Sequence, residues 1–360
     1  MKVVLSGYYG FDNVGDEAIL FSLISALREE NQDIHITVLS NDPEKTAQQY
    51  GVEAVNRWKL KDVAKAIRQS DGLISGGGSL LQDKTGNKSV IYYSGVMWIA
   101  KLLGKPFVIY AQGIGPINQL KNQRIVKHTL NRASLITVRD RDSQEFLTSV
   151  GLKKESTIVP DPVLGMNKPS LDESPWLASE NIPSDYIAVS MRDWSDGREY
   201  LEKTAAALDE LLKKGEKIVL LPMHGEHDYN TLEQLLSLME KRDGDIWMAP
   251  YDATIQEKVV IVGQAKLLLG MRLHALIFAA VMNVPFHALS YDPKIDSFAN
   301  LCQQPVVGHV EKDDWSADDI VTKVITADLS EQNDYLLEYT TEATQKAKHT
   351  AQQTLDILAK

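Results

Sequence analysis

One stretch decides the fold of this chain: AKLLLGMRLHALIFAAVM, residues 265–282. Its first apolar run, residues 265–269, has the length of a strand, and a longer apolar run of helical length begins at Ala275. A strand joined to a helix by a short loop is the repeating unit of a parallel α/β sheet. Ligands bind to such sheets beyond the carboxyl ends of the strands, so we expect the loop GMRLH to lie at a binding site.

The same alternation of strand-length and helix-length runs extends over nearly the whole chain. It predicts a first helix over residues 16–30, because apolar residues recur there at helical spacing. Strands are predicted in two groups, over residues 3–6, 34–39, 72–75, 107–111, 135–138 and 157–159, and over residues 186–190, 217–221, 246–249, 266–269 and 286–289.

The length of 360 residues implies two domains. We predict an α/β protein with two doubly wound, Rossmann-like domains in tandem, which resembles the GT-B architecture and places the active site in the interdomain cleft. The expected divisions are an N-terminal Rossmann-like domain, a linker rich in proline and serine, a C-terminal Rossmann-like domain and a helical segment, over residues 1–165, 166–184, 185–330 and 331–360.

Charge is unevenly distributed along the chain, whose net charge is −11. Residues 1–170 carry 21 Lys+Arg against 17 Asp+Glu, whereas residues 171–360 carry 17 against 32. The acidic half argues against nucleic-acid binding, and the basic half either faces an anionic substrate or membrane or reflects ordinary surface variation. The single cysteine, Cys302, and the lack of a membrane-spanning run favour a cytoplasmic protein.

Cations follow three predicted strands of the second half. Arg192, Arg272 and Lys294 suit a ligand with a carboxylate and a phosphate, and His274 suits the transfer of a proton. The alternative is that each cation forms a surface salt bridge, as Arg192 could with the neighbouring Asp193.

Two further groups of polar residues follow strands. His224 and His227 resemble metal ligands, but without a third ligand we expect no metal and assign them to ligand contact or to a turn. Arg139 is a secondary site residue, with local ion pairing in its RDRDS segment as the alternative.

The loop after the first strand reads SGYYGFDNVGDE, residues 6–17. Its glycine spacing fits neither the dinucleotide fingerprint nor the P-loop, which argues against nicotinamide cofactors and ATP. Its polar side chains suit the hydroxyls of a sugar, from which Asp12, Asn13 or Asp16 could accept hydrogen bonds. Tyr8 or Tyr9 would form a flat wall of the sugar site. The alternative for Asp16 is a helix cap.

Glycine-rich loops follow two more strands of the first half. Gly77 and Gly78 allow the backbone to approach a ligand closely, and Gln112 opens the second loop, QGIGP. We expect these residues to line the same face as the first loop. Tight turns alone are the alternative explanation.

Seven segments, in order, resemble the polysaccharide pyruvyltransferase family and, within it, bacterial enzymes of the CsaB type. They are GYYGFDNVGDEAIL (7–20), ISGGGSLLQD (74–83), YAQGIGPI (110–117), TVRDRDS (137–143), VSMRDW (189–194), GMRLHALIFA (270–279) and YDPKI (291–295). The resemblance implies transfer of pyruvate from phosphoenolpyruvate to a sugar as a ketal, with release of phosphate and no cofactor. The CsaB type implies a 4,6-ketal on β-N-acetylmannosamine of a lipid-linked secondary cell wall polysaccharide precursor, the ligand of surface-layer anchoring domains.

The resemblance assigns roles by motif. Its R-L-H segment falls on Arg272 and His274, its S-M-R-D-W segment on Arg192, and YDPKI on Lys294. We expect His274 to be the acid or base, the three cations to hold the donor, and Asp16 or Asp12 to orient or deprotonate the acceptor hydroxyl. This chemistry requires no metal.

Two other functions stay open at this point: a GT-B glycosyltransferase that uses a nucleotide sugar, and a non-catalytic sugar-phosphate binding protein. A lipid-linked acceptor also suggests peripheral membrane contact through residues 84–105. There the side chains expected near headgroups are Tyr92, Tyr93, Trp98, Lys101, Leu102 and Lys105. The alternative is that these residues pack inside the domain.

Overall fold

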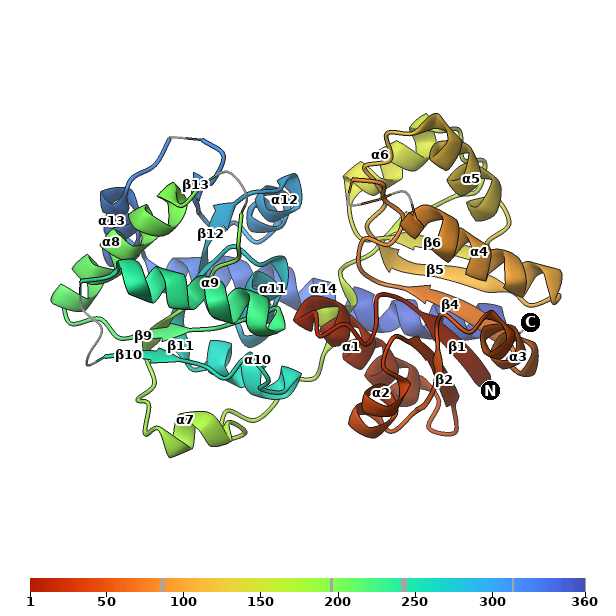
Figure 1. The fold of residues 1–360 in the computed structure, drawn as a ribbon, viewed down its shortest axis with the longest axis horizontal. Coiled ribbons are helices and arrows are strands. Elements are labelled where there is room, and N and C mark those ends of the chain that lie inside the picture. Colours follow the sequence, from red (N-terminus) through yellow and green to blue (C-terminus); the bar gives the residue numbers. More distant parts are fainter. Residues whose placement is uncertain (85, 87, 195–196, 241–244, 313, 360) are drawn as a thin grey trace. The chain divides into compact units, whose positions relative to one another are not determined.

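The structure is a computed structural model, which describes the whole chain except residues 85, 87, 195–196, 241–244, 313 and 360. The chain divides into two compact units, which we call the first domain (residues 1–166 with 343–360) and the second domain (residues 167–342). Figure 1 shows in each of them a sheet with helices on both sides.

The first domain contains a parallel sheet with helices on both faces. Its strands are β1 (Lys2–Ser6), β2 (His35–Ser40), β3 (Glu53–Asn56), β4 (Gly72–Gly76), β5 (Phe107–Gln112), β6 (Leu135–Val138) and β7 (Thr157–Ile158), and its helices are α1 (Val14–Glu30), α2 (Pro43–Tyr50), α3 (Leu60–Gln69), α4 (Lys88–Leu102), α5 (Leu120–Leu130) and α6 (Arg141–Ser149). The described strands lie in the order β3-β2-β1-β4-β5-β6-β7.

The second domain repeats this plan. Its strands are β8 (Tyr186–Ser190), β9 (Ile218–Leu220), β10 (Ile246–Met248), β11 (Ala265–Gly270), β12 (Phe286–Ser290) and β13 (Val306–His309), and its helices are α7 (Pro175–Ser179), α8 (Glu199–Lys213), α9 (Gly225–Leu238), α10 (Ile255–Gly263), α11 (Leu273–Met282), α12 (Pro293–Leu301) and α13 (Ala317–Thr326). The described strand order, β10-β9-β8-β11-β12-β13, is again that of a Rossmann-like sheet. The predicted fold of two such domains in tandem is therefore confirmed.

Residues 167–184 and 331–342, which were expected to lie outside the C-terminal domain, belong to the second domain. Residues 166–184, expected as a linker, include α7, whose start is held by Glu257: its carboxylate accepts hydrogen bonds from the Ser174 hydroxyl at 3.2 Å and the Trp176 N–H at 3.1 Å. The C-terminal segment is one helix, α14 (Leu329–Leu358), whose residues divide between the two units.

Both sheets reverse their strand order at one point, between β1 and β4 in the first domain and between β8 and β11 in the second. Ligands bind to doubly wound sheets outside the carboxyl ends of the strands at this point. The β8 and β11 strands are almost wholly buried, because helices cover both faces of the sheet. Rigid strands thus position the polar loops that follow them.

Candidate active site

The cations predicted in the second domain follow neighbouring strands of one sheet. Arg192 comes two residues after β8, Arg272 two residues after β11, and Lys294 lies in the first turn of α12, which follows β12. The Met271 N–H donates to the Ser190 carbonyl at 2.8 Å, which ties the ends of β8 and β11 together. The structure therefore brings these side chains to one edge of the sheet.

Arg272 is held in a fixed orientation by a buried carboxylate. Its Nε donates to Asp228 Oδ2 at 2.9 Å, and its Nη2 donates to Asp228 Oδ1. The side chain of Asp228 is 1% exposed and that of Arg272 16%. Among the described residues Nη1 has no partner, so that edge of the guanidinium is left for an anion. Asp228 is not among the residues predicted from sequence; it lies in the first turn of α9, the helix that follows β9.

Arg192 and Lys294 share one aromatic ring. The Arg192 guanidinium lies 4.6 Å from the centre of the Tyr291 ring, and Lys294 Nζ lies 5.8 Å from it. Lys294 also pairs with Asp292 at 3.3 Å, whereas Arg192 Nε donates to the backbone carbonyl of Asp193 at 3.2 Å. Both cations therefore lie close to the ring of Tyr291.

His224 lies next to the Arg272–Asp228 pair, at the N-terminus of α9. Burial lowers the pKa of His224 below its ordinary value, the positive charge of Arg272 lowers it further, and the carboxylate of Asp228 opposes both. The imidazole is therefore neutral at neutral pH and able to accept a proton. From sequence, His224 is expected to contact the ligand or to lie in a turn.

His274 lies in the first turn of α11 and is half-buried, while the preceding Leu273 is buried among core residues. The helix begins here because Arg272 keeps an extended backbone and the next residues are apolar. Packing of Leu273 thus fixes the start of the helix that carries His274.

The buried Lys258 holds the loop that precedes His224. Lys258 Nζ donates to the carbonyls of Pro222 at 2.9 Å, Pro250 at 3.2 Å and Tyr251 at 3.1 Å. Burial lowers the pKa of Lys258 to about 8. The loop from Pro222 to His224 is thus positioned by a residue that the sequence analysis did not single out.

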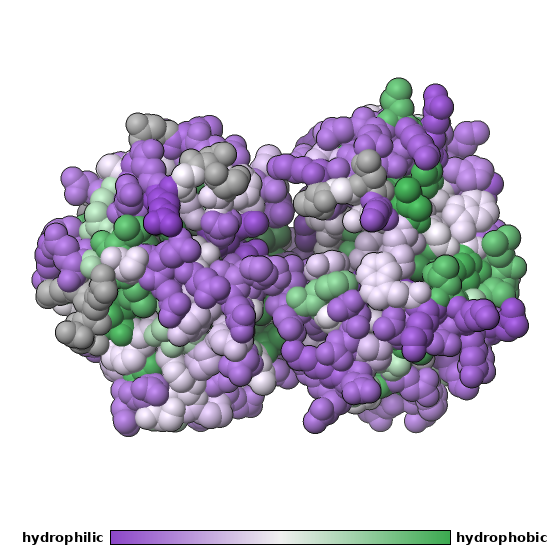
Figure 2. All heavy atoms as spheres, in the orientation of Figure 1, coloured by the Kyte–Doolittle hydropathy of each residue, from purple (hydrophilic) through white to green (hydrophobic). Residues whose placement is uncertain are grey.

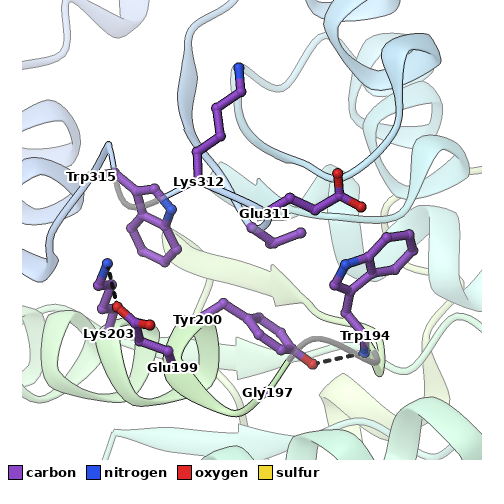
Figure 3. Close-up of a pocket in the computed structure, with 9 residues that line it drawn as sticks. Trp194, Gly197, Glu199, Tyr200, Lys203, Glu311, Lys312 and Trp315 are labelled. Atoms are coloured by element: carbon purple, nitrogen blue, oxygen red, sulfur yellow. Dashed lines mark hydrogen bonds and ion pairs between the residues drawn. The ribbon is translucent and has the colours of Figure 1, made fainter.

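A cavity of about 200 Å³ adjoins the cluster through Trp194, whose ring centre lies 4.8 Å from that of Tyr291. Figure 3 shows Tyr200 with its hydroxyl toward Trp194, and Trp315 above the Lys203–Glu199 pair. Two lysines and two glutamates among the lining residues balance in charge, so the cavity suits a neutral polar group better than an anion.

The three polar loops of the first domain come together at the carboxyl edge of its sheet. The Tyr9 hydroxyl donates to the Gly76 carbonyl at 3.1 Å, and the Gly113 N–H donates to the Gly78 carbonyl at 2.9 Å. A Cβ added at Gly78 would lie 2.6 Å from Asp16 Oδ1, so the carboxylate rests against the glycine backbone. Glycine is therefore required here by close approach as well as by turning.

Within the first loop, the structure assigns separate tasks to the predicted residues. Tyr9 is buried, so Tyr8, which stacks on Phe11 with ring centres 4.0 Å apart, is the accessible wall. Asn13, rather than Asp16, caps α1 by accepting from the Gly15 N–H at 3.1 Å. Asp12 pairs with Lys45 at 2.6 Å.

Asp16 lies close to the exposed tyrosine. Burial is the main cause that raises the pKa of Tyr8 above its ordinary value, and the negative charge of Asp16 raises this pKa further. The neighbouring Glu17 is buried and holds the loop: its carboxylate accepts from the Gly10 N–H and the Tyr50 hydroxyl, each at 2.7 Å. Asp16 is thus the first-loop carboxylate placed beside Tyr8.

Two other predicted residues lie behind these loops. Gln112 is fully buried, and its Nε2 donates to the Ser75 hydroxyl at 2.7 Å. Arg139 donates to the Ser79 hydroxyl at 2.9 Å and pairs with Asp161 at 3.4 Å and Asp140 at 3.6 Å. The expected local pair with Asp140 is therefore present, together with a link to the glycine-rich loop.

No group of three or more His, Cys, Asp and Glu side chains suited to a metal ion occurs in the part of the chain that the structure describes. Within the same residues, no helix is both long and apolar enough to cross a membrane.

Solved structures of similar fold include proteins in complex with sugar nucleotides. HepE of Anabaena, in complex with UDP-glucose, is 14% identical with a TM-score of 0.63 over 100% of this chain and 99% of that chain. The UDP-GlcNAc 2-epimerase of Neisseria meningitidis, bound to UDP-GlcNAc, is 12% identical with a TM-score of 0.62 over 100% of both chains. The corresponding epimerase of Methanocaldococcus jannaschii is 12% identical with a TM-score of 0.60 over 95% of this chain and 100% of that chain.

At these identities the likeness shows the fold alone, which is the GT-B type with two Rossmann-like domains. The family is shown by sequence: the model of the polysaccharide pyruvyl transferase family matches residues 13–293. This match includes Arg192, Arg272 and His274, and the chain therefore belongs to the polysaccharide pyruvyl transferase family. No curated protein matches the chain.

Proposed function

We propose that the protein transfers pyruvate from phosphoenolpyruvate to two hydroxyls of one sugar, forming a cyclic ketal and releasing phosphate. The observation that carries this proposal is the group of cations around β8, β11 and β12 in a chain of this family. Phosphoenolpyruvate has a carboxylate and a phosphate close together, which matches two guanidiniums and an ammonium.

In the proposed reaction C3 of phosphoenolpyruvate gains a proton, which makes C2 electrophilic. One sugar hydroxyl then bonds to C2 and gives up its proton, and a second hydroxyl displaces phosphate from the same carbon, giving up its own proton. Arg192, Arg272 and Lys294 hold the donor anion and stabilise the departing phosphate. A fixed guanidinium loses less freedom on binding, so Asp228 contributes by orienting Arg272.

The two histidines suit different proton transfers. We assign His274 as the acid that protonates C3, as the R-L-H motif implies. His224 suits the opposite step, because its lowered pKa keeps it neutral and ready to accept a proton from a hydroxyl.

On the first domain, we propose that Asp16 and Tyr8 contact the acceptor sugar. The Asp12 carboxylate is already paired with Lys45, which leaves Asp16 as the better orienting group. For the acceptor itself we propose β-N-acetylmannosamine of a lipid-linked cell wall precursor, modified as the 4,6-ketal in the cytoplasm.

The glycosyltransferase alternative draws no support from the structural likeness, since identities of 12–14% show the fold alone. A non-catalytic sugar-phosphate binder would bind phosphoenolpyruvate without turnover, so turnover decides between it and an enzyme.

The direct test incubates the protein with phosphoenolpyruvate and an N-acetylmannosaminyl acceptor on a lipid-like carrier. We expect phosphate release together with the methyl signal of a ketal in the NMR spectrum of the product. Matched incubations supply a UDP-sugar in place of phosphoenolpyruvate. Release of UDP, or phosphoenolpyruvate binding without any product, would contradict the proposal and favour one of the two alternatives.

A further inference from the structure

The segment from Arg57 to Lys105 is strongly basic within an acidic chain. It contains nine Lys+Arg and three Asp+Glu, a net charge of +6 against −11 for the whole chain. Most of these cations lie on or next to α3 and α4, which pack against each other in the first domain (Figure 1). The charge is thus gathered on one part of the domain surface.

Large apolar side chains are exposed in the same segment. Trp58 and Leu60, at the start of α3, are 59% and 58% exposed, and Ile91 and Leu102 on α4 are 51% and 80% exposed. Ile91 and Leu102 are eleven residues apart, about three helical turns, so they lie on one side of α4. Figure 2 shows apolar side chains at the surface over α4, bordered by hydrophilic ones.

The exposed tryptophan is held in place rather than loosely attached. Trp58 Nε1 donates to Asn41 Oδ1 at 2.9 Å, and its ring centre lies 5.4 Å from that of Tyr92. Behind it the buried Arg57 guanidinium lies within 5.3 Å of four aromatic ring centres, including both of these. The domain therefore presents a fixed amphipathic ring to solvent.

Exposed cations lie on or next to the same two helices, and they are Lys59, Lys61, Lys65, Arg68, Lys88 and Lys101. Among the described residues none of them forms an ion pair. The helix α4 contains no acidic residue at all. Unpaired cations near tryptophan and leucine are the composition of surfaces that insert shallowly between anionic headgroups.

We propose that the outer surface of α3 and α4 docks on an anionic phospholipid membrane. Trp58, Leu60, Ile91 and Leu102 enter the headgroup region, and the exposed lysines contact lipid phosphates. Docking at the membrane would hold the enzyme where a lipid-linked acceptor is presented, and this role rests on the proposed function. The binding surface itself is independent of the group that is transferred.

The surface differs from the one expected from sequence. Tyr93 is buried, whereas Trp98 is only half-buried: its Nε1 donates to the Thr129 hydroxyl at 3.0 Å and its ring stacks on His128. Leu102 does face outward, whereas Trp58 and Leu60 precede the expected region of residues 84–105. Residues 85 and 87 of that region lie outside the described part of the chain.

Flotation of the full chain with vesicles tests the proposal. We expect binding to vesicles of phosphatidylcholine mixed with phosphatidylglycerol at low salt, and loss of binding at high salt or on phosphatidylcholine alone. Lys59→Gln with Lys61→Gln should weaken binding about 30-fold, since each cation near an anionic surface contributes about 1 kcal/mol. Leu60→Ser with Leu102→Ser should also weaken it, whereas the exposed pair Lys153→Gln with Lys154→Gln should not.

Phosphate release with a water-soluble acceptor keeps this test separate from the proposed function. Both α3–α4 variants should keep wild-type turnover on that acceptor. Vesicle binding without turnover would leave the docking surface in place and overturn the proposed reaction. Absence of binding to the anionic vesicles, equal binding by the Leu60→Ser, Leu102→Ser variant, or a dimer in solution that this variant converts to a monomer would overturn the membrane proposal.

Discussion

Removal of the Asp228 carboxylate should disturb both stability and donor binding. Asp228→Asn keeps the size of the side chain but presents an amide N–H group to the Arg272 guanidinium. Two charge-assisted hydrogen bonds of about 1.5–3 kcal/mol each are weakened, and breaking a buried ion pair typically costs about 3–5 kcal/mol. Because the Arg272 side chain is 16% exposed and can recruit water, we expect a loss near the lower end, about 3 kcal/mol.

Urea unfolding measures the loss of stability directly, and isothermal titration with phosphoenolpyruvate measures the loss of donor binding. Once Arg272 can rotate, the dissociation constant of phosphoenolpyruvate should rise by at least about tenfold. The pKa of His224, followed by NMR, should fall further, since the Asp228 charge raises it. The exposed Asp193→Asn is the control and should leave stability unchanged. An Asp228→Asn protein with wild-type stability and wild-type donor affinity would refute the reasoning.

Three further outcomes are expected. Burial lowers the pKa of His287 to about 4, so the unfolded chain binds more protons between pH 6.5 and 4; the free energy of unfolding should fall by about 2 kcal/mol from pH 6.5 to 5, and His287→Gln should remove that dependence in urea titrations. Gly78→Ala and Gly104→Ala both place alanine at positive φ and should cost about 1–2 kcal/mol, but only the Gly78 variant, whose Cβ meets Asp16, should raise the KM for the acceptor. Phosphoenolpyruvate should raise the Tm by mass action and UDP-sugars should not; the reverse order would favour a glycosyltransferase.

The fold could be predicted because buried parallel strands leave a strong signal. Strands such as β8 are apolar along most of their length, and loops rich in glycine or polar residues mark their ends. The strands that sequence analysis missed, β3 and β13, are short and only partly buried, with a glutamate, an asparagine and a histidine among their residues. No apolar run marks such edge strands.

The candidate site was predictable in part for the same physical reason. Arg192, Arg272 and Lys294 follow strands, and the order of strands in the sheet brings them to one edge. The partners that orient them were not predictable, because Asp228 approaches Arg272 from a different βα unit, 44 residues away. Pairwise geometry of this kind depends on packing between elements, which periodicity does not encode.

In the first loop, the sequence showed which residues are polar but not which contacts each of them makes. Asn13, Asp12 and Asp16 carry similar groups, yet one caps a helix, one pairs with Lys45 and one lies beside Tyr8. Tyr8 and Tyr9 are adjacent and identical, but the backbone of Gly7 leaves room beneath it for the Tyr9 ring alone. Burial separates such residues only after the chain has folded.

The central claim is that two residues of the R-L-H segment have different roles: Arg272 binds the donor, and His274 transfers a proton. Donor affinity and turnover, measured on folded Arg272→Ala and His274→Ala proteins, test it most directly. Arg272→Ala should lose phosphoenolpyruvate binding, because charge-assisted hydrogen bonds of about 1.5–3 kcal/mol each disappear. His274→Ala should keep most of the binding and lose turnover by about 100 to 10,000-fold. Near wild-type turnover by His274→Ala would show that the proton comes from another group, such as His224, and would contradict the account.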